Sequence, residues 1–252
     1  MNDASPDSHS PLHDGSLHDA GVYVQYGCGL CAPDRWLNFD VSPRLRLERS
    51  PGLRVALGAT FGLIFPANVR VGDIVQGLRV ADGSARGVYC SHVLEHLPRD
   101  DVPPALRNTY RILAPGGLFR AVVPDLRWRA ARYLRSAERE DPAAADALIA
   151  ACALGTREKP RTIMSVLRTR FSRGAHLWMY DFAALRALLE QAGFTHVRRC
   201  EPGDCIDPMF ALVEDKARFF EAGERELAVE AIKPGRDSQA RSPAVGPQQS
   251  IR

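Results

Sequence analysis

The chain has 252 residues, of which 45% are hydrophobic and 25% charged, and its formal net charge is +3. This composition is typical of a globular protein with one α/β domain and a modest insertion. It excludes several classes: the charge is too small to imply a nucleic-acid partner, no apolar run approaches the roughly 18 residues that span a bilayer, and six cysteines do not make a disulfide framework in a chain of this length.

Both ends of the chain lack the apolar residues that a folded core needs. Residues 1–20 are rich in Asp, Ser, His and Pro and contain no apolar signal segment, which predicts a cytoplasmic protein. Residues 235–252 are equally poor in side chains that can be buried. We therefore expect disordered tails at 1–20 and 235–252 and a folded domain at 21–234.

Short apolar runs alternate with helical patterns through this domain. Helices are predicted at 102–113, ended by a Pro-Gly-Gly turn, and at 180–192, ended by Gly193. Such alternation predicts an α/β fold with a doubly wound, mostly parallel, seven-stranded Rossmann-like sheet that ends in a hairpin. The predicted strands are 22–26, 36–41, 69–74, 87–91, 118–123, 197–200 and 227–232.

Residues 126–175 interrupt this alternation. Residues 126–154 are rich in Ala and Arg and read as mostly helical, and residues 157–173 carry six basic side chains against one acid. An insertion after the fifth strand lies at the carboxyl end of the sheet, where α/β proteins bind ligands. We interpret it as a helical, basic cap over a ligand site; a solvated basic face is the alternative.

The first strand runs into a glycine loop. Gly27 and Gly29, with Ala32, fit the pattern G-x-G-x-x-A, which nicotinamide and S-adenosylmethionine sites share. In the dinucleotide fingerprint the next acid lies about 20 residues on, after the helix that holds the pyrophosphate. Here Asp40 comes eleven residues after Gly29, so little room remains for that helix. This favours S-adenosylmethionine, with Asp40 either accepting hydrogen bonds from the ribose hydroxyls or capping its strand.

Four segments, taken in order, resemble one enzyme family. They are VYVQYGCG at 22–29 followed by WLNFD at 36–40, Gly72-Asp73 followed by Gly83-Ser84, SHVLEHL at 91–97, and RILAPGG at 111–117 running on to VPDL at 123–126. Together they resemble class I S-adenosylmethionine-dependent methyltransferases, specifically the small bacterial "predicted methyltransferase" group with a shortened glycine loop. The resemblance implies S-adenosyl-L-methionine as cofactor and methyl transfer, EC class 2.1.1, as the reaction.

The resemblance also implies cofactor-binding residues at the ends of the strands. Asp73 would accept a hydrogen bond from the adenine amino group, although a turn aspartate is an alternative. Ser91 and His92 would lie beside the methionine end of the cofactor. The full set of cofactor-binding candidates is Gly27, Cys28, Gly29, Asp40, Asp73 and Ser91.

The candidates for catalysis are Asp125, His176 and His92. Asp125 directly follows the fifth strand and would position an acceptor or act as a base, and His176 would close over the acceptor as a general base. Structural roles are open for both, and His96 is interpreted as a structural histidine. No metal site is predicted, because the Cys28-x-x-Cys31 spacing is explained by the glycine loop.

One position departs from the family pattern. The acid that normally stands two residues before the first glycine is Gln25 here, which keeps hydrogen bonding but loses the charge. Its loss keeps a second function open: a non-catalytic binding or regulatory protein with a degenerate methyltransferase fold. A nicotinamide-dependent oxidoreductase is disfavoured by the missing phosphate-binding helix.

The sequence limits the partners without naming one. The basic run at 157–173 suits an anionic small-molecule or sugar-type acceptor. Neither a nucleic acid nor a membrane is expected as a partner, and the oligomeric state is left open.

Overall fold

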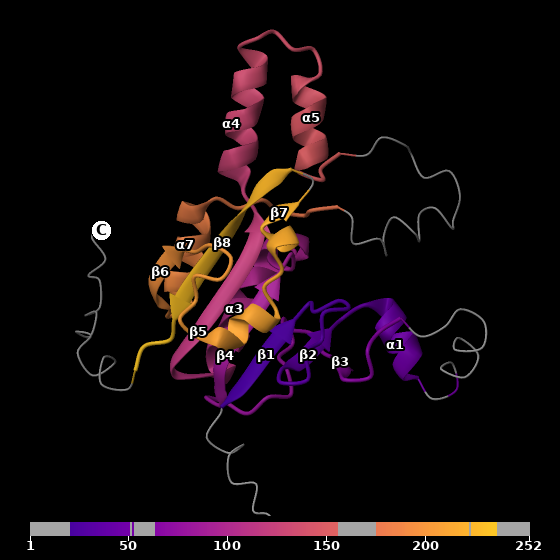
Figure 1. The fold of residues 1–252 in the computed structure, drawn as a ribbon, viewed down its shortest axis with the longest axis vertical. Coiled ribbons are helices and arrows are strands. Elements are labelled where there is room, and N and C mark those ends of the chain that lie inside the picture. Colours follow the sequence, from indigo (N-terminus) through magenta and orange to yellow (C-terminus); the bar gives the residue numbers. More distant parts are fainter. Residues whose placement is uncertain (1–20, 51, 53–63, 156–174, 222, 236–252) are drawn as a thin grey trace, which may run out of the picture.

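The computed structural model describes residues 21–50, 52, 64–155, 175–221 and 223–235. The predicted tails at 1–20 and 235–252 lie outside these residues, apart from Gly235, and so does the basic run at 157–173. Figure 1 shows one central sheet with helices packed against it and a helical hairpin that projects from one end.

The sheet has the strand order β3-β2-β1-β4-β5-β8-β6, with β7 paired to β8. Neighbours from β3 to β5 pair in parallel, whereas β8 is antiparallel to both β5 and β6. This confirms the predicted doubly wound, mostly parallel sheet of seven strands. The strands are β1 (Val22–Tyr26), β2 (Leu37–Asp40), β3 (Val69–Val71), β4 (Ala85–Ser91), β5 (Leu113–Pro124), β6 (Thr195–Arg199), β7 (Phe220–Glu221) and β8 (Glu224–Ile232).

The final pair of strands differs from the predicted hairpin. β6 and β8 are antiparallel neighbours, as expected. The connection between them is not a tight turn, however, because it contains the short 3-10 helices Pro208–Leu212 and Lys216–Arg218 and the two residues of β7. This connection covers one face of the sheet, a function that the sequence pattern did not indicate.

The two faces of the sheet are buried by different parts of the chain, since successive strand residues point to opposite faces. Val24 of β1 belongs to a core shared with Leu106 of α3 (Val102–Ile112) and Leu185 of α7 (Phe182–Gln191). Tyr23, the residue before Val24, packs instead on Trp36 and Phe210. The ring centroids of Tyr23 and Trp36 lie 5.3 Å apart, and those of Trp36 and Phe210 lie 5.4 Å apart. Among the described residues, α1 (Pro43–Arg49) also lies beside the sheet, next to β3.

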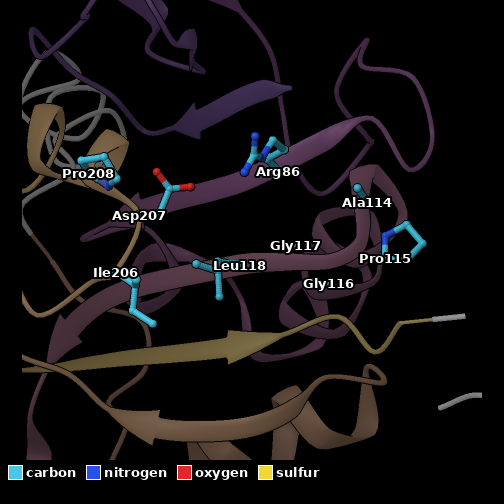
Figure 2. A pocket seen from close by; sticks show the side chains of 9 residues that line it. All are labelled: Arg86, Ala114, Pro115, Gly116, Gly117, Leu118, Ile206, Asp207 and Pro208. Atoms are coloured by element: carbon cyan, nitrogen blue, oxygen red, sulfur yellow. The ribbon is translucent and has the colours of Figure 1, made fainter. Parts of the chain in front are cut away.

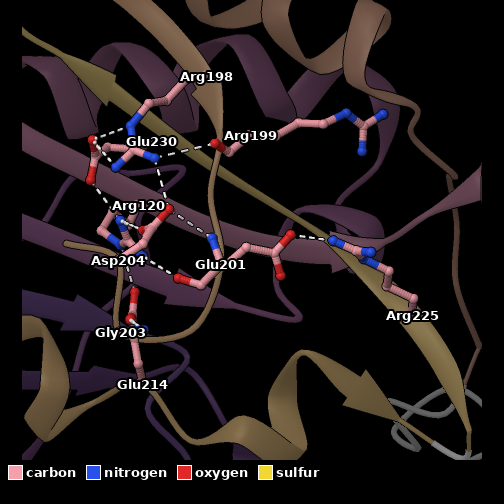
Figure 3. A network of polar contacts seen from close by, with 9 residues as sticks. All are labelled: Arg120, Arg198, Arg199, Glu201, Gly203, Asp204, Glu214, Arg225 and Glu230. Carbon is pink, nitrogen blue, oxygen red and sulfur yellow. Dashed lines mark hydrogen bonds and ion pairs between the residues drawn. The ribbon is translucent and has the colours of Figure 1, made fainter.

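A charged network ties the β6–β8 connection to the sheet (Figure 3). The guanidinium of Arg120 on β5 is 1% exposed and lies 2.5 Å from Glu214, 2.6 Å from Glu230 and 2.9 Å from Asp204. Arg198 of β6 also contacts Glu230 and Asp204. A buried arginine is tolerated only with such partners, so the network fixes how the connection lies on the sheet.

The predicted helical stretch at 126–154 is two helices rather than one. α4 (Leu126–Ala137) and α5 (Ala144–Ala151) pack against each other and project from the carboxyl end of the sheet (Figure 1). Arg129 of α4 anchors the hairpin, since it is 2.8 Å from Glu226 of β8 and donates to the carbonyl of Ala151 at 2.8 Å. Within the described residues, no helix combines the length and the apolarity that a bilayer crossing requires.

Candidate functional site

Two adjoining cavities lie at the carboxyl ends of β1 to β4. The larger, of about 180 Å³, is bordered by residues that follow all four of these strands. The smaller, of about 20 Å³, shares Tyr26 and Gly27 with it and reaches Ser91 and Arg218. The larger cavity is lined by Tyr26, Gly27, Val41, Gly72, Asp73, Ile74, His92, Val93, His96 and Leu97.

A bigger cavity, of about 520 Å³, lies at the other end of the strands, where β4 and β5 begin (Figure 2). Its walls are the first residues of β4 and β5 together with residues 206–208. Asp207, the acid among the described residues of this lining, accepts a hydrogen bond from Tyr23 at 2.5 Å. None of the predicted site residues lines this cavity, whereas several line the two smaller cavities at the carboxyl ends of the strands, where α/β folds bind ligands.

The glycine loop packs closely against the residues that follow β4. Gly27 and Gly29 have φ of +67° and +55°, a region that favours glycine. A Cβ on Gly27 would lie 2.2 Å from Cγ2 of Val93, so another residue fits here only if Val93 or the loop is displaced. The backbone of Gly27 thus forms the shared wall of the two cavities.

Asp40 stabilises this loop through hydrogen bonds to the backbone. Its two carboxylate oxygens accept hydrogen bonds from the amides of Gly29 at 3.1 Å and Ser42 at 2.7 Å. The residue is 1% exposed and does not line either cavity. Cys28 is also buried but lines the smaller cavity, and its amide donates to the carbonyl of Phe39.

Asp73 and Ser91 do line the cavities. One carboxylate oxygen of Asp73 accepts from the amide of Val75 at 2.9 Å, in the manner of a turn aspartate, while the residue borders the larger cavity. The hydroxyl of Ser91 is buried at the smaller cavity and has no hydrogen-bond partner among the described residues. Both positions therefore present polar atoms to a ligand.

Gln25 belongs to the framework of the loop. Its amide nitrogen donates to the side-chain oxygen of Asn38 at 2.6 Å and to the carbonyl of Cys31 at 2.7 Å. A carboxylate has no hydrogen to donate, so the family's usual acid could not make these two bonds. The departure from the family pattern thus has a structural reason in this chain.

His92 ends β4 with a backbone φ of 54°, an uncommon value for a residue other than glycine. Its Nε2 lies 3.1 Å from the carbonyl oxygen of Arg218, and its Nδ1 lies 3.2 Å from a carboxylate oxygen of Glu95. Strained residues of this kind cluster at functional sites. The histidine borders the larger cavity directly.

A cluster that the sequence did not predict surrounds the carboxylate of Glu95. The rings of His96 and His176 lie 5.1 Å apart beside it, and Glu95 itself is 0% exposed. The carbonyl of Glu95 accepts hydrogen bonds from the amides of Leu177 and Trp178, which fixes this segment over the end of β4. Burial lowers the pKa of His176 and outweighs the opposing effect of the Glu95 carboxylate. Burial also raises the pKa of Tyr180, whose hydroxyl has no partner among the described residues, to about 12.

The three predicted catalytic residues therefore do not lie at one place. His92 and His176 both lie near the carboxylate of Glu95. Asp125 instead caps α4, because one carboxylate oxygen accepts from the amides of Arg127 and Trp128, and the other lies 3.3 Å from Arg199. Asp125 lines neither cavity. The sequence signal for the cluster is the adjacent pair Glu95-His96, although His96 is interpreted from the sequence alone as a structural histidine.

Comparison with known proteins agrees with this architecture. Residues 27–198, more than half of the chain, match the model of the family described as "Methyltransferase domain". No curated protein is similar enough to count as a relative.

Three solved structures are among those similar to this chain. An S-adenosylmethionine-dependent methyltransferase from Methanosarcina mazei is 16% identical, with a TM-score of 0.46 over 90% of this chain and 99% of that one. A methyltransferase in complex with the Trm112 activator of Haloferax volcanii is 16% identical, with a TM-score of 0.42 over 85% of this chain and 83% of that one. A third, from Thermotoga maritima, is 15% identical, with a TM-score of 0.39 over 86% of this chain and 84% of that one.

The family match covers the glycine loop, the end of β4 and most of the sheet, where the two cavities lie. The chain therefore belongs to the methyltransferase domain family, whose enzymes use S-adenosyl-L-methionine.

Proposed function

We propose that this chain transfers a methyl group from S-adenosylmethionine to a small, anionic acceptor, with the cofactor in the two cavities and the acceptor beside Glu95 and His176. The observation that carries the proposal is the wall that Gly27 forms between the cavities, with Asp73 on one side and Ser91 on the other. We also assign the chain to the small bacterial group with a shortened glycine loop. The direct passage from the loop to β2, with no helix between them, supports this assignment.

The larger cavity suits the nucleoside half of the cofactor. Asp73 uses one carboxylate oxygen for the amide of Val75, which leaves the other to accept a hydrogen bond from an adenine amino group. Asp40 holds the glycine loop, because its two carboxylate oxygens accept hydrogen bonds from the amides of Gly29 and Ser42. We therefore assign Asp40 to positioning the loop against which the cofactor would bind.

The residues around the smaller cavity suit the charged end of the amino-acid half. Arg218 brings a guanidinium that can pair with a carboxylate, and Ser91 brings a hydroxyl without a partner among the described residues. Gln25 is not assigned to ligand binding, because its amide holds Asn38 and Cys31. The residues present therefore fit S-adenosylmethionine.

The reaction needs little from the side chains. The bound cofactor supplies an electrophilic methyl on a good leaving group, so proximity and alignment provide most of the rate enhancement. The segment that starts at His176 is held over the end of β4 by the two hydrogen bonds to the Glu95 carbonyl, which orients the acceptor side of the site.

The acceptor side carries both charge and aromatic surface. Arg99 lies 5.9 Å from the ring centroid of Trp178, which is 46% exposed, so the pair offers a cation beside an aromatic face. The hairpin of α4 and α5 reaches this region through the carbonyl of Cys152, which contacts His176. We propose that residues 126–175 act as a cap, with an anionic acceptor bound between the cap and the sheet.

Calorimetric titration with S-adenosylmethionine and S-adenosylhomocysteine tests the proposal. Wild-type protein should bind both saturably, and Gly27→Ala should lose binding, because its Cβ meets Val93 and its φ is strained. Gly116→Ala is the matched control, since Gly116 has φ +79° and no atom within 4 Å of the added Cβ. Equal loss in both variants, or no binding by the wild type, would overturn the proposed site.

A further inference from the structure

We propose that Glu95, His96 and His176 form a binding site for one divalent transition-metal ion at the edge of the cofactor cavity. One potential ligand atom of each residue lies within 4.8 Å of the other two. An ion with bonds of about 2.0–2.2 Å holds its ligand atoms within roughly 4.4 Å of one another, so a small side-chain adjustment completes the site.

The two imidazoles are oriented as metal ligands are. Nδ1 of His96 lies 3.1 Å from the carbonyl oxygen of Ala175, and Nδ1 of His176 lies 2.8 Å from that of Cys152. A carbonyl oxygen only accepts, so Nδ1 carries the proton in each neutral ring and Nε2 keeps its lone pair. Metal-bound histidines characteristically donate their second ring nitrogen to such a group.

The buried carboxylate of Glu95 favours a bound cation independently of the two histidines. It is 0% exposed, and neither of its oxygens has a hydrogen-bond partner among the described residues. His92 and His96 approach one oxygen to 3.2 and 3.9 Å, but neither contact has hydrogen-bond geometry. Burying an anion without such partners is costly, and a bound cation would offset that cost.

The donor set decides the class of ion. Two imidazole nitrogens and one carboxylate suit Zn²⁺, Fe²⁺, Co²⁺ or Mn²⁺, whereas Mg²⁺ and Ca²⁺ prefer oxygen ligands. Three protein ligands leave at least one coordination position open. Because His96 also lines the larger cavity, that position adjoins the cofactor site. We infer that an oxygen of the acceptor occupies this open coordination position, an inference that rests on the proposed function.

Metal binding can be measured without cofactor or acceptor. Full-length protein freed of metal with a chelator should bind Zn²⁺ at one site by calorimetry and should give a visible absorption spectrum with Co²⁺. Both signals should weaken roughly tenfold or more in Glu95→Gln and His176→Asn. His196→Asn is the control for loss of an exposed histidine, and Cys31→Ser tests whether thiolates bind the ion instead.

Thermal unfolding distinguishes this site from a merely structural carboxylate. Without metal, Glu95→Gln should melt at the same temperature as the wild type or higher, because a neutral amide replaces a buried anion. With Zn²⁺ the order should reverse, since only the wild type gains from binding. A Glu95→Gln variant that melts lower in both conditions, or a Zn²⁺ signal that only Cys31→Ser removes, would overturn the proposal. Titration of the metal-free protein with S-adenosylmethionine tests the proposed function separately.

Discussion

The imidazole rings of His96 and His176 lie 5.1 Å apart, although α3, β5, α4 and α5 all separate them in the sequence. The contact depends on Glu95, whose carbonyl accepts the amide hydrogens of Leu177 and Trp178. The proposed acceptor side of the site is therefore assembled by one short piece of chain that follows the insertion and lies against the end of β4.

Replacing Ser91 should separate ligand binding from stability. Its hydroxyl has no partner among the described residues, so Ser91→Ala should leave the melting temperature unchanged. Loss of one hydrogen bond to the cofactor should weaken S-adenosylmethionine binding by about 1 kcal/mol, measured by calorimetry. Ser84→Ala, which removes a hydroxyl bonded to the Ala81 carbonyl in a turn outside the two smaller cavities, should leave the affinity for S-adenosylmethionine unchanged. Unaltered affinity in Ser91→Ala would remove Ser91 from the binding site.

Restoring the family's acid at position 25 should weaken the protein. Gln25→Glu cannot donate to Asn38 or Cys31 and buries a charge against two acceptors, so we expect a loss of about 2–3 kcal/mol in unfolding free energy. Urea unfolding measures this loss. Gln191→Glu, at an exposed position at the end of α7, should cost only a few tenths of a kcal/mol. Equal stability of the two variants would contradict the structural role of Gln25.

Asp125 should behave as a helix cap. Asp125→Ala leaves the amides of Arg127 and Trp128 without their acceptor and should cost about 1–2 kcal/mol of stability. Asp125→Asn keeps an acceptor oxygen and should lose much less, because the partly exposed Arg199 contributes little as an ion partner. Denaturant unfolding of both variants provides the measurement. If alanine and asparagine destabilise the protein equally, the carboxylate charge rather than the cap is responsible.

The network around Arg120 should make stability depend on pH through Asp204. Burial would raise the pKa of Asp204, but hydrogen bonds from Arg198, the Glu201 amide and Arg120 hold that pKa below its usual value. A carboxyl whose pKa is lowered on folding stabilises the protein above its unfolded pKa of about 4 and loses that effect as the pH falls through its folded pKa.

The difference in unfolding free energy between wild type and Asp204→Asn should therefore be largest near neutral pH. It should close progressively below about pH 4. Asp100→Asn, which changes an exposed carboxylate, is the control and should show no comparable trend. A gap between wild type and Asp204→Asn that stays constant down to the acid transition would contradict the assignment.

The sequence alone determined the parts of this protein that depend on local pattern. Short apolar runs located the strands, and helical spacing located α3 and α7, because each element must bury apolar side chains whatever lies opposite. The glycine loop and its short distance to Asp40 indicated the class of cofactor, since backbone conformation at Gly27 and Gly29 is a local property.

Only the tertiary structure decided what the polar side chains contact. Gln25 meets Asn38 because β1 and β2 pair, and Arg120 meets Glu214 only because the β6–β8 connection folds back over the sheet. The grouping of Glu95 and His96 with His176 depends on where the insertion returns, which no local pattern encodes. Hydrogen bonds and charge pairs act over a few ångströms in space rather than along the chain. The role of a polar residue, structural or functional, is therefore decided only when the fold brings its partners together.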